Sequence, residues 1–211
     1  MKRNCKFAAV ILAAGMSTRL GRPKQLLRVA GKSMLEHAIT AARGAGIVTP
    51  VLVLGAFADD ILKDVRSVTK CETIINHDFA DGQATSLKAG VSSIMDKCDA
   101  AIFMLADQPL ITATLIMELM TRFNQHKPHI LHPVYRKRRG NPVIISARLF
   151  PRLLASTGDQ GARFLFADTS LSVHAYEVED KAVVTDVDTW DDYFTLVDSA
   201  NGSTHPQKEN R

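Results

Sequence analysis

The sequence predicts an α/β fold: a single three-layer α/β/α domain with a mostly parallel, Rossmann-like sheet and some antiparallel strands in its second half. Short, purely apolar runs alternate with segments of helical periodicity, as expected for strands that helices cover on both faces. The length of 211 residues suits one domain with one core. From Ile130 onward the apolar runs change in length, which predicts the antiparallel strands.

The predicted strands of the first half are continuous apolar runs. Residues 7–12 are apolar throughout and lead into small residues, which is typical of a buried parallel strand that enters a tight loop. In the second half, Val134 and the segments at residues 143–145 and 173–178 predict strands that join the same domain. The remaining predicted strands are residues 51–54, 73–75 and 100–105.

Helices are predicted between these strands. Ser33, followed three residues later by Glu36, has the pattern of a capping box and predicts the start of a helix that Gly44 ends. Periodicity predicts further helices at residues 59–65, 86–95 and 115–123. Because residues 199–211 are polar and aperiodic, we expect a domain of residues 1–198 and a disordered tail at 199–211.

Charge and cysteine content exclude several classes of protein. The net charge is +4, and the dense basic run at residues 136–139 contains no aromatic residue. We therefore expect a solvated basic turn or a contact with a small anion there, and no nucleic-acid partner. The three cysteines, Cys5, Cys71 and Cys98, lack zinc spacing and indicate reduced thiols in a cytoplasmic protein.

The N-terminus superficially resembles an export signal, because basic residues precede an apolar run. The run is short, however, and no small-x-small cleavage site follows it. No segment reaches the about 20 apolar residues that a membrane helix needs. We therefore expect neither export nor a membrane partner.

The loop after the first strand combines small residues with positive charges. Ligands of open α/β sheets bind beyond the carboxyl ends of the strands. There, residues 13–15 allow the backbone to approach a ligand closely, and their N–H groups can cradle phosphate oxygens. Arg19, Arg22 and Lys24 add cations, although the spacing matches neither a P-loop nor G-x-G-x-x-G. The loop favours a phosphate-bearing ligand, with an ordinary strand-to-helix turn as the alternative.

Carboxylates in two places are candidates for a metal site. Asp107 ends a fully apolar strand, where a carboxylate is costly unless it is paired or holds a cation. Since one or two carboxylates and substrate phosphates typically hold Mg²⁺, Asp107 and the later Asp188 are the predicted ligands. Alternatively, Asp107 caps the turn at Pro109, and Asp188 or Thr189 caps a C-terminal helix.

No motif for covalent or zinc-dependent hydrolysis accompanies these residues. The sequence contains neither H-E-x-x-H nor G-x-S-x-G. When the nucleophile is itself a phosphate, no side-chain nucleophile or general base is needed. Cations, backbone amides and Mg²⁺ are then sufficient for catalysis.

At this level of detail the motifs resemble a known family. Residues 12–24, continued by Gln25 to Leu27 and Gly31, resemble the signature of nucleotidyltransferases with the glycosyltransferase-A-like fold. Further segments narrow the resemblance to one subgroup of this family. They are Asn76 with residues 82–90, and residues 105–109, 139–143, 158–163 and 186–193. Together they resemble molybdenum cofactor cytidylyltransferases, over about residues 7–195.

The resemblance implies a reaction and a set of residues. In that family the phosphate of the molybdenum–pterin cofactor attacks the α-phosphate of CTP, which releases pyrophosphate and forms molybdopterin cytosine dinucleotide. It implies Mg²⁺ as cofactor, CTP and the molybdenum–pterin cofactor as substrates, and allows a molybdenum hydroxylase apoenzyme as partner. The implied nucleotide-binding residues are Leu12, Ala13, Ala14, Gly15, Lys24, Gly82 and Ser86. Lys24, Arg19 and Asp107 are implied as catalytic, Asp107 and Asp188 as metal ligands, and Arg139, Gly140, Asn141, Asp159 and Arg163 as contacts of the second substrate.

The choice of base follows from one position of the resemblance. Guanylyltransferase relatives carry a second glycine where this chain has Ala14, so the chain resembles the cytidylyl form. One methyl group discriminates by only about 1–3 kcal/mol, so other residues must contribute.

Two further functions remain open from the sequence. A cytidylyltransferase of a sugar or isoprenoid phosphate shares the Pro23-Lys24-Gln25 stretch, but residues 107–109 and 140–142 fit it poorly. A carrier or maturation factor for a molybdenum hydroxylase has the same fold without catalysis. Retention of Lys24, Asp107 and Asp188 argues for catalysis, because a pure carrier needs no metal–triphosphate site.

Overall fold

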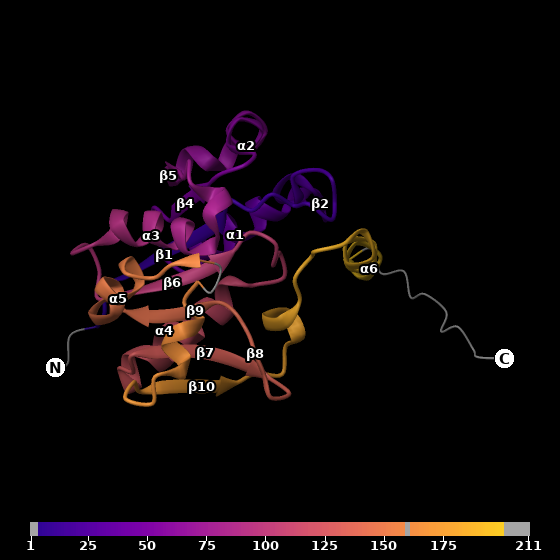
Figure 1. Cartoon of the computed structure of the whole chain (residues 1–211). Coiled ribbons are helices and arrows are strands. Elements are labelled where there is room, and N and C mark those ends of the chain that lie inside the picture. Colours follow the sequence, from indigo (N-terminus) through magenta and orange to yellow (C-terminus); the bar gives the residue numbers. More distant parts are fainter. Residues whose placement is uncertain (1–3, 159–160, 201–211) are drawn as a thin grey trace.

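A mixed β-sheet runs through the centre of the molecule in the computed structural model, which describes residues 4–158 and 161–200 (Figure 1). Its strand order is β10-β7-β9-β6-β1-β4-β5, and β8 pairs with β7. A separate small hairpin is formed by β2 (Arg28–Val29) and β3 (Lys32–Ser33). The strands of the main sheet are β1 (Phe7–Ala13), β4 (Val51–Leu54), β5 (Glu72–Ile75), β6 (Ala100–Leu105), β7 (Ile130–Tyr135), β8 (Arg138–Arg139), β9 (Val143–Ser146) and β10 (Val173–Glu177).

Strand direction confirms the predicted fold class. β1 is parallel to both β4 and β6, and β5 continues the parallel half beside β4. In the second half β9 runs antiparallel to β6 and β7, whereas β10 is parallel to β7. β4 and β6 lie on opposite sides of β1, so the chain reverses its direction of winding at the β1–β6 edge. Such a switch point is where open α/β sheets bind ligands.

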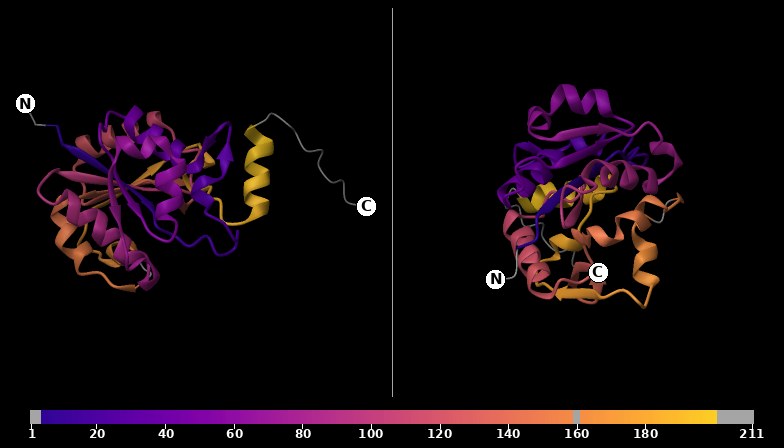
Figure 2. Two further views of the ribbon diagram at one scale, coloured as in Figure 1. Left: turned by 90° about the horizontal axis from the view of Figure 1, so that it is seen from above. Right: turned by 90° about the vertical axis from the view of Figure 1, so that its left-hand side faces the viewer.

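Helices cover both faces of the sheet and complete three layers. α1 (Met34–Gly44), α2 (Ala58–Asp64) and α4 (Ala113–His126) pack on one face, and α3 (Gln83–Ile94) and α5 (Phe150–Leu154) pack on the other. Because side chains of a strand alternate between faces, Ile11 of β1 belongs to the first core and Val10 to the second. Figure 2 shows the two helical layers on either side of the strands.

Several elements begin and end where the sequence predicts. β4 and β6 have the predicted bounds. The capping box of α1 is present, since Ser33 Oγ accepts a bond from the Glu36 N–H at 3.2 Å and Glu36 Oε2 accepts one from the Ser33 N–H at 2.8 Å. α3 and α4 each begin earlier than periodicity indicated, because their first turns are polar or small and carry no apolar signal.

The last described helix, α6 (Trp190–Ala200), stands apart from the sheet and packs on the β2–β3 hairpin (Figures 1 and 2). Thr189 caps it, because its Oγ1 accepts a bond from the Asp192 N–H at 3.2 Å and Asp192 Oδ2 accepts one from the Thr189 N–H at 2.8 Å. Ser199 and Ala200, which were predicted in the tail, belong to this helix. The rest of the predicted tail lies outside the described residues.

The basic run forms a turn and a short strand at the surface, and the cysteines are partly buried. Arg136 and Lys137 have positive φ and form the exposed turn between β7 and β8. All three cysteines are free and partly buried, and burial raises the pKa of both Cys71 and Cys98 to about 11. Among the described residues, no helix is both long and apolar enough to cross a membrane.

Candidate active site

A lysine and two aspartates meet beyond the carboxyl ends of β1 and β6. Lys24, the first residue of a 3-10 helix at Lys24–Leu26, places its Nζ 2.7 Å from Asp107 Oδ2 and 2.7 Å from Asp188 Oδ1. Nζ also donates to the Val187 carbonyl oxygen at 3.3 Å. Asp107 lies two residues beyond the end of β6, and its carbonyl accepts a bond from the Val187 N–H at 3.1 Å, which brings the late segment to the sheet.

Burial and neighbouring charges shift the pKa values of Lys24 and Asp107 in opposite directions. The Lys24 and Asp107 side chains are 14% and 17% exposed, and that of Asp188 is 42% exposed. Burial raises the pKa of Asp107, and the Lys24 ammonium offsets this shift only in part. Burial lowers the pKa of Lys24, but the charges and hydrogen bonds of Asp107 and Asp188 outweigh it, so the pKa lies above its ordinary value. The hydrogen bond from Lys24 lowers the pKa of Asp188.

Arg19 extends the cluster toward solvent. Its Nη1 lies 3.1 Å from Asp188 Oδ2, while its side chain is 68% exposed. An exposed pair of this kind contributes little to stability. Arg19 lines neither of the two pockets described below, and its guanidinium reaches the cluster only through Asp188.

Asp107 and Asp188 can supply part of the ligand set of a divalent cation. The Asp107 Oδ1 atom is buried, and no described residue donates a hydrogen bond to it. The described ranges contain no group of three or more His, Cys, Asp or Glu side chains that could hold a metal alone. Mg²⁺ commonly takes one or two carboxylates and completes its shell with water and phosphate oxygens. The Asp107 side chain contacts Lys24. The alternative in which Asp107 caps the turn at Pro109 required a contact with that turn instead.

A pocket of about 340 Å³ opens beside this cluster. The N-terminus of α3 faces it, with Gly82 at φ +108° immediately before the helix. Ser86 is 6% exposed, and its Oγ accepts a hydrogen bond from Asn76 Nδ2 at 3.0 Å. All the residues predicted to bind the nucleotide line this pocket, namely Leu12, Ala13, Ala14, Gly15, Lys24, Gly82 and Ser86.

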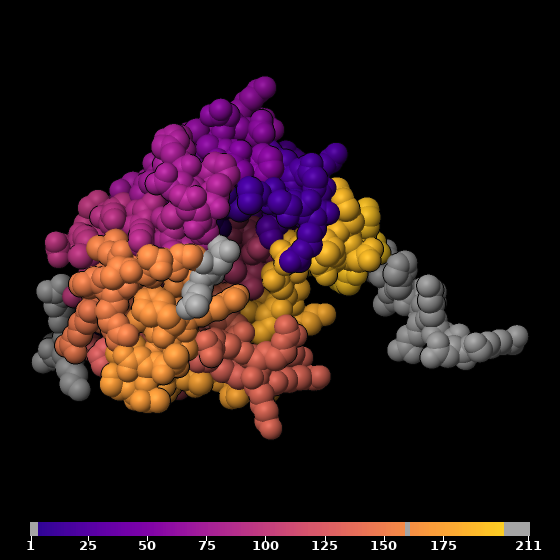
Figure 3. Space-filling view, viewed as in Figure 1, coloured from indigo at the N-terminus to yellow at the C-terminus, as the bar shows by residue number. Residues whose placement is uncertain are grey.

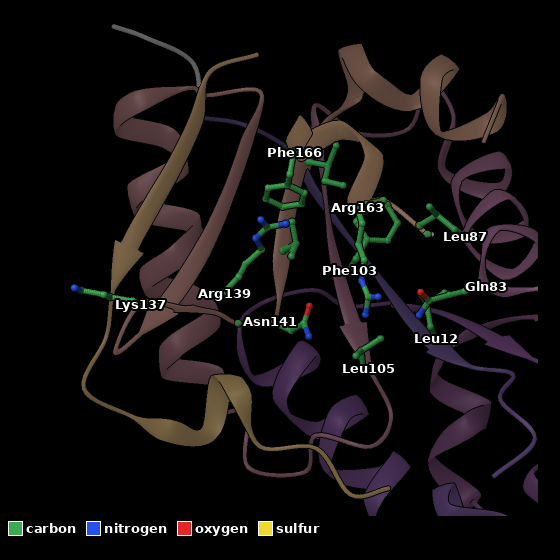
Figure 4. Close-up of a pocket in the computed structure, with 15 residues that line it drawn as sticks. Leu12, Gln83, Leu87, Phe103, Leu105, Lys137, Arg139, Asn141, Arg163 and Phe166 are labelled. Atoms are coloured by element: carbon green, nitrogen blue, oxygen red, sulfur yellow. The ribbon is translucent and has the colours of Figure 1, made fainter. Parts of the chain in front are cut away.

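A second pocket, of about 490 Å³, adjoins the first (Figure 4). The two share Leu12, Gln83 and Leu105 in their walls, so together they form one cleft. The space-filling view shows a hollow between the indigo N-terminal loop and the orange and red segments of the second half (Figure 3). Of the residues predicted to contact a second substrate, Arg139, Gly140, Asn141 and Arg163 line this pocket. Asp159 lies outside the described residues.

One wall of the second pocket pairs a cation with a ring. The Arg139 Cζ atom lies 3.9 Å from the centroid of the Phe166 ring, within the range of a cation–π contact. In Figure 4, Arg139 points toward Phe166, whereas Lys137 points away from the pocket. Phe166 belongs to no charged or glycine-rich motif and was not predicted, whereas Gln83 lies within the segment of residues 82–90 but was not singled out.

Gly140 lines the second pocket, but packing alone requires a glycine there. A Cβ atom at this position would lie 2.6 Å from the carbonyl oxygen of Val183. We expect Gly140→Ala to lower the free energy of unfolding by about 1–3 kcal/mol, because overpacking forces the backbone to shift. Urea unfolding measures this effect, and an unchanged midpoint would contradict it.

Gly15 is the opposite case. A Cβ atom at Gly15 meets nothing within 4 Å, and the residue lines the first pocket. We expect Gly15→Ala to change the free energy of unfolding by no more than about 0.5 kcal/mol while weakening nucleotide binding. Thermal melting and calorimetric titration with nucleotide separate the two effects. Equal nucleotide affinity in mutant and wild type would show that the ligand does not approach Gly15.

A mostly parallel α/β sheet, with Lys24, Asp107 and Asp188 clustered at its switch point beside a two-part cleft, fits the class of nucleotidyltransferases. The family model described as the MobA-like NTP transferase domain matches residues 9–175. The chain belongs to this family and is a nucleotidyltransferase.

The chain is similar to known proteins over most of its length. A protein named nicotine blue oxidoreductase, from Paenarthrobacter nicotinovorans, is 31% identical over 198 residues, which is 89% of this chain and 95% of the relative. The crystal structure of Rv0371c from Mycobacterium tuberculosis H37Rv has 28% identity and a TM-score of 0.84, covering 93% of this chain and 99% of that one. A complex of Rv0371c with manganese has a TM-score of 0.79 at 27% identity and covers 92% and 99%. A divalent metal thus accompanies this fold in a relative.

Proposed function

We propose that the protein transfers CMP from CTP to the phosphate of the molybdenum–pterin cofactor, forming molybdopterin cytosine dinucleotide and pyrophosphate. The observation that carries the proposal is the two-part cleft, in which the Lys24–Asp107–Asp188 cluster borders one pocket and Arg139 and Arg163 line the other. One pocket takes the nucleotide, and the adjoining pocket takes the acceptor. Leu12 and Leu105 line both, so the reacting phosphates meet between them.

Each charged residue has a role in this reaction. The acceptor phosphate oxygen attacks the α-phosphorus of CTP, and the bond to pyrophosphate breaks. Lys24 and Arg19 neutralise the triphosphate, and residues 12–15 contact the base and ribose. Asp107 and Asp188 would hold Mg²⁺, which would supply positive charge to the phosphates. The manganese complex of a relative supports a divalent cation on this fold.

Ala14 supports CTP as the nucleotide. It lines the first pocket at 6% exposure, and a Cβ at Gly55 would lie only 2.7 Å from the Ala14 methyl group. Gly55 therefore leaves the room that this methyl group needs. A methyl in the pocket wall narrows the space for a base, which favours the smaller pyrimidine over a purine.

The second pocket suits an anionic acceptor with a planar ring system. Arg139 and Arg163 supply charge, Asn141 and Gln83 supply polar groups, and Phe166 supplies a flat apolar face. A pterin with a phosphate has the matching features. The same cations would also receive a smaller sugar or isoprenoid phosphate, which would leave the aromatic wall unused.

Replacing Arg139 by Met tests the acceptor pocket. We expect the KM for the acceptor to rise about tenfold or more, since a charge-assisted contact contributes about 1.5–3 kcal/mol. The KM for the nucleotide should stay unchanged, because Arg139 does not line the first pocket. Initial rates at varied acceptor concentration measure the effect, with Arg138→Met as the control, since Arg138 is the neighbouring residue and does not line the second pocket. Equal acceptor KM values in both variants would remove Arg139 from the site.

Pyrophosphate release is the direct test of the proposed function. CTP and GTP are compared, each with Mg²⁺ and purified molybdenum cofactor, and each without the cofactor. Release that needs both CTP and the cofactor is the expected result. Release from GTP would overturn the base assignment and keep the family. No release in any arm would favour a sugar or isoprenoid phosphate acceptor, or a maturation factor.

The cellular setting follows from the same proposal. We propose that the protein acts in the cytoplasm and passes its product to a molybdenum hydroxylase apoenzyme. One relative carries the name of an oxidoreductase, and no redox group of this chain is needed for the proposed transfer. Oxidation of NADH or NADPH in the same assay, without pyrophosphate release, would argue for a redox activity instead.

A further inference from the structure

A buried glutamine packs behind the loop of residues 12–16 that leaves β1. Gln25 follows Lys24 in the 3-10 helix and is 2% exposed. Its Nε2 donates to the Ala13 carbonyl oxygen at 3.0 Å and to the Gly15 carbonyl oxygen at 3.2 Å. Both hydrogens of one side-chain amide thus hold two carbonyls of the loop that leaves β1.

These bonds complete a set that turns the loop carbonyls toward the protein. The Leu12 carbonyl accepts from the Ala106 N–H at 3.1 Å, and the Ala14 carbonyl accepts from the Ala56 N–H at 3.3 Å. With Gln25 on the two others, every carbonyl from residue 12 to residue 15 has a protein donor. Within the described ranges no acceptor binds the N–H groups of Gly15 and Met16, both of which line the first pocket. The loop therefore presents donors, and no competing carbonyls, to the cleft.

Stability of the fold alone does not explain a glutamine at position 25. Its Oε1 atom is buried, and no residue in the described part of the chain donates to it. A buried acceptor without a donor costs free energy, which an apolar side chain of similar size would avoid. A role in shaping the loop accounts for a glutamine at this place.

We propose that Gln25 is a positioning residue for nucleotide binding: it fixes the two carbonyls so that the N–H groups of Gly15 and Met16 meet acceptor atoms of the nucleotide. The proposal rests on the proposed function, in that the first pocket is taken to bind a nucleoside triphosphate. Gln25 also borders the first pocket, but its Nε2 group is engaged by the two carbonyls and its Oε1 atom is buried, so it acts on the ligand through the loop.

Gln25→Met and Gln25→Glu test this role. Methionine keeps the size and removes both donors, and the glutamate carboxylate repels the two carbonyls. We expect the Kd and KM for nucleotide to rise about tenfold, or 1.4 kcal/mol, with kcat and the KM for the acceptor changed by no more than about threefold. Ser33→Ala is the matched control, since Ser33 is 4% exposed and caps α1 away from both pockets. It should lower the melting temperature and leave nucleotide binding unchanged.

Calorimetric titration with CTP, GTP, UTP and ATP in the presence of Mg²⁺ gives the decisive readout. If the wild type binds one of these and folded Gln25→Met binds it equally well, the role of Gln25 is overturned and the proposed function stands. If the wild type binds none, both fail together. Weaker binding in Gln25→Met and Gln25→Glu, beside an unchanged Ser33→Ala, supports the positioning role.

Discussion

Replacing Asp107 by Asn is expected to reduce kcat for nucleotidyl transfer by about 10³-fold. The amide keeps the shape of the side chain and can still accept the bond from Lys24 Nζ, which lies 2.7 Å from Oδ2 in the wild type. It supplies no negative charge to a divalent cation. Pyrophosphate release measures kcat, and loss of nucleotide-dependent Mn²⁺ binding, followed by the paramagnetic resonance of free Mn²⁺, reports the metal site directly.

Asp186→Asn is the matched control for this experiment. Asp186 raises the pKa of Asp107 through its charge, but it is exposed and lies two residues before Asp188. It should retain kcat within about threefold, as expected of a surface carboxylate. Wild-type turnover in a folded Asp107→Asn variant would remove Asp107 from the metal site.

Replacing Lys24 by Met is expected to lower turnover and to raise the affinity of the nucleotide-free protein for Mn²⁺. Turnover should fall about 10²-fold or more, because the triphosphate loses a buried cation. In the absence of nucleotide, the affinity for Mn²⁺ should rise about tenfold, because Nζ otherwise occupies one oxygen of each carboxylate. Titration of the nucleotide-free protein with Mn²⁺ measures the second effect.

Arg19→Met supplies the comparison for Lys24. Arg19 contacts only Asp188 among these carboxylates and is mostly exposed, so removing it should change Mn²⁺ affinity much less. If Lys24→Met binds Mn²⁺ no better than the wild type, while Asp107→Asn loses its binding, the ammonium does not compete with the metal.

Local signals account for the parts of the fold that were predicted well. The capping box of α1 joins two residues three positions apart, so Ser33 and Glu36 predict it from the sequence alone. The apolar runs of β4 and β6 are bounded by their own composition, which gave their limits. The parallel pairing of β10 with β7 joins segments about forty residues apart, and nothing in either strand encodes that partner.

The candidate site divides in the same way. Its charged residues could be identified from the sequence, because a charge next to a buried apolar strand costs free energy unless it is paired or binds a ligand. Gln25 was recognised only as part of a motif, and Phe166 was missed. A buried amide behind a loop and a ring beneath a guanidinium become visible only through contacts with residues distant in the chain.

The sequence by itself determined the α/β class, the loop after the first strand and the identity of the charged residues, because apolar periodicity and isolated charges are local properties. Only the tertiary structure decided that Lys24 lies between Asp107 and Asp188, which are 83 and 164 residues away along the chain. It also decided that the cleft has two adjoining parts and that Gln25 ties back the loop. The physical reason is that these contacts depend on strand order and on the return of the late segment to the sheet, which are set by packing of the whole core.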